Sequence, residues 1–195
     1  QIPLVMATFS AMLTHHRSGK ARILAVTADQ RSRAAPEIET AAEQGLPDDE
    51  VNDLLETRSG AYWIATGNGL CLYNPKGMPL PYGKESLQSD PMFAVYRIGG
   101  DRATSAIKAL YEDRSGAVWV GAWRGLYRLE QAGSQVKFHY IELGMPASEP
   151  QTHVVRNILE DRQGTLWLTT DGGLYRRFSD GRVDRFTRNH GFSSE

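Results

Sequence analysis

The chain has 195 residues, 41% of them hydrophobic and 23% charged, with a formal net charge of −1. This composition is typical of a globular protein, and the near-neutral charge excludes a nucleic-acid binder, which needs clustered basic residues. The most apolar stretch, residues 2–9, is far shorter than the roughly 20 residues that cross a bilayer, so we expect no membrane contact by this segment. The single cysteine, Cys71, excludes an intrachain disulfide framework. Gln1 begins no signal pattern, and we expect the chain to start inside a longer protein.

Residues 1–50 are the least regular part of the chain. Met12–Gly19 can be aligned with Asp53–Gly60, which belongs to a repeat that recurs further on. Arg22 then stands where the later copies have a tryptophan, and the Gly-Leu pair that follows in those copies is missing. We interpret residues 1–50 as a degenerate copy of the repeat followed by a link.

Three later segments align without a gap, namely residues 51–63, 107–119 and 155–167. Each ends in a tryptophan and is followed by a Gly-Leu pair. The tryptophans lie 56 and 48 positions apart, and repeats of about 40–50 residues are typical of propeller blades. The longer interval therefore predicts an insertion, which we place near residues 75–90, with several prolines and glycines.

The third copy shows how one unit divides into four short strands. Strands are predicted over 155–160, 165–170, 174–178 and 183–187, separated by turns rich in Asp and Gly. Such short connections leave no room for a helical crossover, so the sheet must be antiparallel. Large apolar residues at adjacent positions of Thr165–Thr169 predict that both faces of the sheet are covered, as in stacked blades.

The sequence thus predicts an all-β fold of β-propeller blades, each a four-stranded antiparallel sheet, forming a partial array cut from a larger propeller. The blades are expected over 51–106 with the insertion, 107–154, and 155–195, which includes the start of the next link. Turn and packing residues recur at equivalent positions. They are Trp63, Trp119, Trp167, Gly60, Gly116, Gly164, Asp113 and Asp161.

These residues resemble the two-component regulator propeller repeat, whose pattern is roughly V-x-x-I-x-E-D-x-x-G-x-L-W-I-G-T-x-x-G-L-Y-R. Residues 155–176 match it almost throughout, whereas the second copy departs at Ala122–Arg124 and the first has Thr57 for Asp and Cys71 for Tyr. The resemblance implies a periplasmic or extracellular sensor segment of a membrane-anchored bacterial signalling protein, such as a hybrid histidine kinase. It also implies a carbohydrate or small-metabolite ligand and an output domain outside this chain.

Candidate ligand-binding residues lie in the turns between the second and third strands, which share a face of the propeller with the links between blades. They are Asn68, Trp123, Arg124 and Asp171, with Asp48–Asp49 and Ser148–Glu149 in the links. An exposed tryptophan offers a stacking surface for a sugar, and an arginine offers a charged fork. Packing of Trp123 on the next blade is the structural alternative.

No catalytic residue, metal site or cofactor is predicted. The five histidines lack ligand spacing, and apolar packing explains Cys71 better than nucleophilic chemistry does. Two other functions stay open, namely a scaffold that recruits a protein partner and a propeller enzyme of the streptogramin lyase type. An incomplete array would leave a sheet face for further blades of the parent chain, and we expect the fragment alone to be marginally stable or to self-associate.

Overall fold

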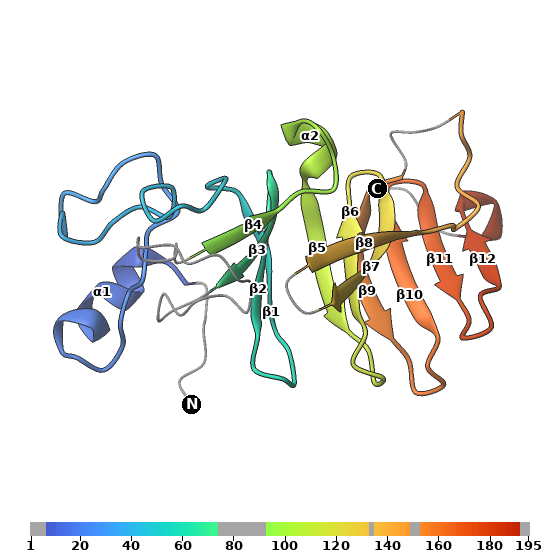
Figure 1. Ribbon diagram of the computed structural model, residues 1–195, viewed down its shortest axis with the longest axis horizontal. Coiled ribbons are helices and arrows are strands. Elements are labelled where there is room, and N and C mark those ends of the chain that lie inside the picture. Colours follow the sequence, from blue (N-terminus) through green and yellow to red (C-terminus); the bar gives the residue numbers. More distant parts are fainter. Residues whose placement is uncertain (1–6, 74–92, 133–134, 149–152, 192–195) are drawn as a thin grey trace.

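The computed structural model describes residues 7–73, 93–132, 135–148 and 153–191. Three four-stranded antiparallel sheets stand side by side along the chain (Figure 1). In each sheet the strands lie in chain order, and each strand is hydrogen-bonded to the next. The predicted all-β architecture of four-stranded blades is therefore confirmed. The expected insertion at 75–90 lies outside the described residues.

The strand and helix bounds follow from the hydrogen-bond ladders. The first sheet holds β1 (Val51–Glu56), β2 (Tyr62–Thr66), β3 (Gly69–Tyr73) and β4 (Phe93–Tyr96). The second sheet holds β5 (Ile107–Glu112), β6 (Val118–Ala122), β7 (Gly125–Ala132) and β8 (Gln135–Ile141). The third holds β9 (Val155–Glu160), β10 (Leu166–Thr170), β11 (Gly173–Arg177) and β12 (Val183–Phe186). The helical segments are α1 (Phe9–Arg17), α2 (Arg102–Ser105) and η2 (Arg188–His190), and no described helix is long and apolar enough to span a membrane.

The turn between the first two strands is held by one carboxylate. Asp161 accepts hydrogen bonds from the backbone N–H groups of Gln163 and Thr165, both at 2.9 Å, and from the indole N–H of Trp167 at 2.8 Å. These bonds, the one from Trp167 first, lower the pKa of Asp161. Gly164 completes the turn at φ 79°, a conformation that glycine adopts without a steric penalty.

The second sheet repeats this arrangement and the first departs from it. Asp113 accepts from the Trp119 indole at 2.7 Å and from the backbone N–H of Ala117 at 3.0 Å. In the first sheet Thr57 occupies the same place, and its hydroxyl accepts from the backbone N–H of Ala61 at 3.0 Å. The aspartate thus ties the turn to the tryptophan of the next strand, and this tie explains their fixed spacing in the repeat.

Apolar layers fill the spaces between neighbouring sheets. Trp63 and Trp119, 2% and 6% exposed, each belong to a layer shared with the next sheet. Trp63 lies in a cluster with Ile107, Leu110, Val118 and Val120 of the second sheet. Trp119 lies in a cluster with Val155, Ile158, Leu166 and Leu168 of the third. Both faces of the middle sheet are therefore buried, as the apolar runs in its strands require.

Arginines of the turns clamp each sheet to the next. Arg114 donates to the backbone carbonyls of Asp161 and Arg162 at 2.6 and 2.7 Å, and its own backbone N–H donates to the Glu160 carboxylate at 3.0 Å. Arg58 makes the same set of contacts to Glu112 and to the carbonyls of Asp113 and Arg114. The Glu-Asp-Arg stretches of the repeat are thus occupied by bonds between sheets.

Residues 7–50 do not form the predicted degenerate blade. The segment aligned to a blade strand and turn, 12–19, lies mostly in helix α1, and no four-stranded sheet is present in the described part of 7–50. Phe9 and Leu13 are four residues apart, so one face of the helix packs both of them against Val26, Ala35 and Ile38. Gly19, aligned as a turn glycine, instead follows the helix end at φ 72°.

The segment after this helix covers the outer face of the first sheet. Ala41 and Leu46 pack with Ile64, Cys71 and Phe93 in a cluster separate from the Trp63 layer. Cys71 is fully buried there, and burial raises its pKa to about 12. This environment agrees with a packing role for the thiol.

Replacing Asp113 should loosen the second sheet. Asp113→Ala removes the acceptor of the Trp119 indole and of the turn N–H groups, and we expect a loss of about 2 kcal/mol in the free energy of unfolding. Asp113→Asn keeps one acceptor oxygen and should lose about half as much. Urea denaturation measures both, and equal stability of Asp113→Ala and the wild type would contradict the argument.

The arginine clamp can be tested with a matched pair of variants. Arg114→Ala should cost about 1.5 kcal/mol because two charged hydrogen bonds between sheets are lost. Arg162→Ala, at the equivalent position of the third sheet, should change the stability by less than about 0.5 kcal/mol, since its guanidinium has no partner among residues 7–73, 93–132, 135–148 and 153–191. Equal effects of the two substitutions in urea denaturation would refute the clamp.

The thiol of Cys71 reports on the cover of the first sheet. At pH 8 we expect labelling by a maleimide to be about 100-fold slower in the folded chain than in urea, because the thiol is buried and its raised pKa keeps it protonated. Leu46→Ala should expose this face of the first sheet and raise the rate of labelling. Leu129→Ala is the control for general destabilisation, because Leu129 belongs to the second sheet and packs against the opposite face of the first. Rapid labelling of the folded wild type would mean that residues 25–46 do not cover this face.

Candidate functional site

One edge of the three sheets gathers the links and the turns between second and third strands, and we call it the link edge. The backbone N–H of Gly67 donates to Glu50 at 2.9 Å, that of Trp123 to Ala106 at 3.0 Å, and that of Asp171 to Val154 at 3.3 Å. Each turn is thereby tied to the link that precedes its own sheet. The Asp-x-x-Gly turns lie along the opposite edge, at the bottom of Figure 1.

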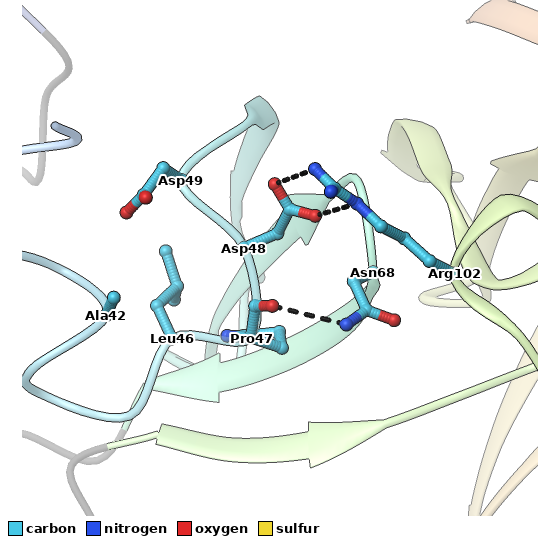
Figure 2. Close-up of a pocket in the computed structure, with 7 residues that line it drawn as sticks. All are labelled: Ala42, Leu46, Pro47, Asp48, Asp49, Asn68 and Arg102. Carbon is cyan, nitrogen blue, oxygen red and sulfur yellow. Dashed lines mark hydrogen bonds and ion pairs between the residues drawn. The ribbon is translucent and has the colours of Figure 1, made fainter. Parts of the chain in front are cut away.

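A pocket of about 240 Å³ lies on the link edge of the first sheet. Figure 2 shows its lining residues, which come from the link before β1, the β2–β3 turn and α2. They are Ala42, Leu46, Pro47, Asp48, Asp49, Asn68 and Arg102. The β2–β3 turn approaches closely because Gly67 has no side chain, and a Cβ there would lie 2.9 Å from the Glu50 carboxylate.

An ion pair and an amide form the polar side of the pocket. The Arg102 guanidinium binds both carboxylate oxygens of Asp48, at 2.7 and 3.0 Å. Asn68 donates to the Pro47 carbonyl at 3.2 Å and accepts from Arg97 at 3.4 Å. Arg102 is positioned by α2, whose first turn is capped by the side chain of Asp101. The Arg102 guanidinium is thus held on Asp48, with the side-chain amide of Asn68 beside it (Figure 2).

Asp49 faces the other side of the same pocket, near Ala42 and Leu46 (Figure 2). Its Oδ1 atom is buried and has no hydrogen-bond partner among the described residues. Buried polar atoms are nearly always paired, so this carboxylate oxygen is an acceptor in the pocket lining that the described residues leave free.

β-bulges direct further charged side chains toward the link edge. The ladder of each first strand shifts register at the same place, and the extra residues are Asn52, Lys108 and Arg156. Lys108 pairs with Glu50 at 2.6 Å, and its hydrogen bond and charge lower the pKa of Glu50. Arg156 pairs with Asp171 through both carboxylate oxygens, which raises the pKa of Arg156.

The four predicted site residues lie on the same edge, but the structure does not gather them into one pocket. Asn68 lines the pocket of the first sheet, while Asp171 is engaged by Arg156 on the third. Trp123 and Arg124 form the tip of the β6–β7 turn. Trp123 is 39% exposed, so at most part of its side chain packs on the neighbouring blade. The role of these residues in binding stays a prediction.

Sequence reasoning missed Arg102 and the bulge residues. Arg102 belongs to a short helix within a link, and the signal that marks it is the capping sequence Asp101-Arg-Ala-Thr104. The bulges have no sequence signature of their own, but each stands one residue after the first position of an aligned strand. Glu149, the remaining link residue of the prediction, lies outside the described residues.

The opposite edge holds a second pocket of about 240 Å³ between the first two sheets. Its polar lining includes Thr57, Ser59 and Glu112. These groups already have partners, since the Thr57 and Ser59 hydroxyls bond each other at 2.9 Å and Glu112 is bound by Arg58. No group of three or more metal-ligating side chains occurs among the described residues on either edge.

The family model named two component regulator propeller matches residues 45–68 and 148–172. No curated protein matches the chain. The matched segments contain the links, first strands and turns of the first and third sheets, and the second sheet has the same geometry although it is outside them.

Solved structures with the same fold include extracellular domains from B. thetaiotaomicron. A domain assigned to a hybrid two-component system is 22% identical, with a TM-score of 0.52 over 76% of this chain and 18% of its own. Another, assigned to a one-component system, is 21% identical, with a TM-score of 0.53 over 73% of this chain and 17% of its own. The chain therefore spans under a fifth of these structures, and at such identity the likeness concerns the fold.

A virginiamycin B lyase from Staphylococcus aureus is 18% identical, with a TM-score of 0.47 over 70% of this chain and 41% of its own. So weak a likeness says nothing about activity. The two matched segments and the three equivalent sheets agree with the predicted resemblance. Two segments, residues 45–68 and 148–172, thus match the two component regulator propeller repeat, and the three sheets are folded like blades of a β-propeller.

Proposed function

We propose that the chain is the extracytoplasmic, ligand-binding part of a bacterial two-component signalling protein, on the periplasmic or extracellular side of the membrane. In this proposal it binds a carbohydrate or another small metabolite at the link edge and passes the binding event to an output domain outside the chain. The repeat family and the extracellular domains of similar fold support the context. The proposal assigns no catalysis and no cofactor to these residues.

The observation that carries the proposal is the pocket beside Asp49. Its lining combines an unpaired buried carboxylate oxygen, an amide and the Asp48–Arg102 ion pair with the apolar side chains of Ala42 and Leu46. A sugar offers hydroxyl donors to carboxylates, hydroxyl acceptors to an arginine, and C–H faces to apolar groups. The lining therefore suits a polyhydroxylated ligand.

The opposite edge is the weaker candidate because its polar groups hold the sheets together. Arg58, Glu112, Arg114 and Glu160 are joined across the sheet boundaries. A ligand there would have to replace bonds between blades, whereas a ligand in the pocket of the first sheet would meet the Oδ1 atom of Asp49, which has no partner among the described residues.

A thermal-shift screen followed by calorimetric titration tests the proposal. The chain is screened against neutral oligosaccharides, uronic-acid oligosaccharides and amino acids, and we expect a hit from the sugar set to raise the unfolding midpoint. Asn68→Ala or Asp49→Asn should weaken its binding by about tenfold, a change of roughly 1.4 kcal/mol. Trp123→Ala should weaken it only if the sugar extends to the β6–β7 turn.

Arg182→Ala is the matched control, because Arg182 is exposed and pairs with Asp180 within the β11–β12 turn. It should leave binding unchanged. If no compound shifts the midpoint and a protein partner is captured instead, the sensor proposal fails and the scaffold function replaces it.

A further inference from the structure

The first sheet lacks the aspartate that binds the tryptophan in the other two sheets. There the turn carboxylate accepts the indole N–H, from Trp119 at 2.7 Å and from Trp167 at 2.8 Å. Thr57 stands at this place in the first sheet and offers one side-chain oxygen instead of two. The indole N–H of Trp63 has no hydrogen-bond partner among the described residues, although Trp63 is only 2% exposed.

The Trp63 ring occupies the same place in its sheet as the ring of Trp167 does. Trp63 packs against Tyr96 with ring centroids 5.9 Å apart, and Trp167 packs against Phe186 at 6.2 Å. Tyr96 and Phe186 hold equivalent positions in the fourth strands of the two sheets. With the ring in this place, the Trp63 indole borders the turn, and it lines a pocket together with the turn residues.

A second donor borders the same gap. The backbone N–H of Ser115 donates to the Oδ1 atom of Asp113 at 2.8 Å, while the indole binds Oδ2. The third sheet divides its two carboxylate oxygens in the same way. The backbone N–H of Ser59, at this position of the first sheet, has no hydrogen-bond partner within the described part of the chain. The two donors that the two oxygens of a carboxylate would satisfy are thus both unpaired.

The charges at the boundary between the first two sheets leave room for an anion. Glu112 lines the pocket there and is bound by Arg58 at 3.3 Å. The next boundary has the same pair, Glu160 with Arg114, and in addition Asp113. Burial raises the pKa of Asp113, but the hydrogen bonds that it accepts outweigh this effect and lower the pKa, so the carboxylate is ionised. The first boundary therefore holds one negative charge fewer than the second beside a matching ion pair.

The remaining walls of the pocket suit a short aliphatic chain. Ala61, Val118 and Leu129 line the pocket with apolar side chains. Its volume of about 240 Å³ is below the roughly 300–1,000 Å³ of sites for drug-sized ligands. A small acid that uses the two unpaired donors leaves the contacts between Arg58 and Glu112 in place, whereas a sugar would have to replace them.

We propose that this pocket binds a small aliphatic monocarboxylate, of the size of acetate to butyrate. One carboxylate oxygen accepts the indole N–H of Trp63 and the other accepts the backbone N–H of Ser59. The ligand thus supplies the carboxylate that the first sheet lacks at Thr57. Its aliphatic end lies against Val118 and Leu129 of the second sheet, so the bound acid bridges the two sheets. The site is separate from the pocket on the link edge, and the proposal does not depend on the sensor function.

The indole N–H signals of the isotope-labelled chain test the site by nuclear magnetic resonance. Acetate, propionate and butyrate are titrated at constant ionic strength, with chloride and the neutral propionamide as controls. We expect the Trp63 signal to move downfield and to saturate, because its N–H gains an acceptor. The signals of Trp119 and Trp167 should stay in place, since their donors are already bound. Propionamide should bind at least about tenfold more weakly than propionate, because it lacks the charge.

Thr57→Asp supplies the missing carboxylate from the chain itself. This substitution should move the Trp63 signal downfield without any added acid and should abolish the response to propionate. Trp63→Phe removes the indole donor, and propionate should then no longer raise the midpoint of thermal unfolding as it does in the wild type. Trp167→Phe, at the equivalent position of the third sheet, is the matched control and should keep the response to propionate.

Two results overturn the proposal. One is a Trp63 signal that none of the acids moves, or that propionamide moves as readily as propionate does. The other is a response to propionate that survives in both Thr57→Asp and Trp63→Phe, because the acid then binds elsewhere. The Trp119 signal is present in every variant and reports that the second sheet is folded, so a lost response is distinguished from unfolding.

Discussion

The stacking of apolar sheet faces against one another is the interaction on which the arrangement of this molecule depends. A strand such as Val118–Ala122 is buried along its whole length, which an antiparallel sheet with one wet face would not require. The tryptophans of the first two repeats, Trp63 and Trp119, pack against apolar strands of the next sheet, so each of these layers is shared by two blades. The hydrogen bond from the indole to the turn aspartate then orients the ring for this contact.

This dependence separates the two edges of the sheets. On the edge of the Asp-x-x-Gly turns, charged residues bind the neighbouring blade. Their hydrogen-bonding groups are therefore already engaged in contacts between sheets. On the link edge, bulges and a capped helix bring Lys108, Arg156 and Arg102 to acidic partners around open turns. The same repeat therefore builds a structural edge from the turns between first and second strands, and a variable edge from the other turns and links, which differ more between copies.

Much of the fold could be predicted because three copies of the repeat align in the sequence. The strands, the turn glycines and the packing of Trp63 and Trp119 follow from period and residue type. Residues 12–19 misled the alignment since a helix that ends in glycine resembles a strand that ends in a turn, and only the i, i+4 spacing of Phe9 and Leu13 distinguishes them. The pocket was not predictable as a unit, because Asp49, Asn68 and Arg102 meet through three different connections whose paths depend on tertiary contacts.

The outer face of the first sheet is covered by a segment of irregular backbone. Residues 25–46 bury Ile64, Cys71 and Phe93 with irregular backbone, and the same segment continues into Pro47, Asp48 and Asp49 of the pocket. Covering the sheet and shaping the pocket are therefore done by one stretch of chain. In the proposed function, a ligand that engages Asp49 would act directly on the segment that packs against β2 and β3, and its binding would be coupled to the stability of the first sheet through shared residues rather than through a long path.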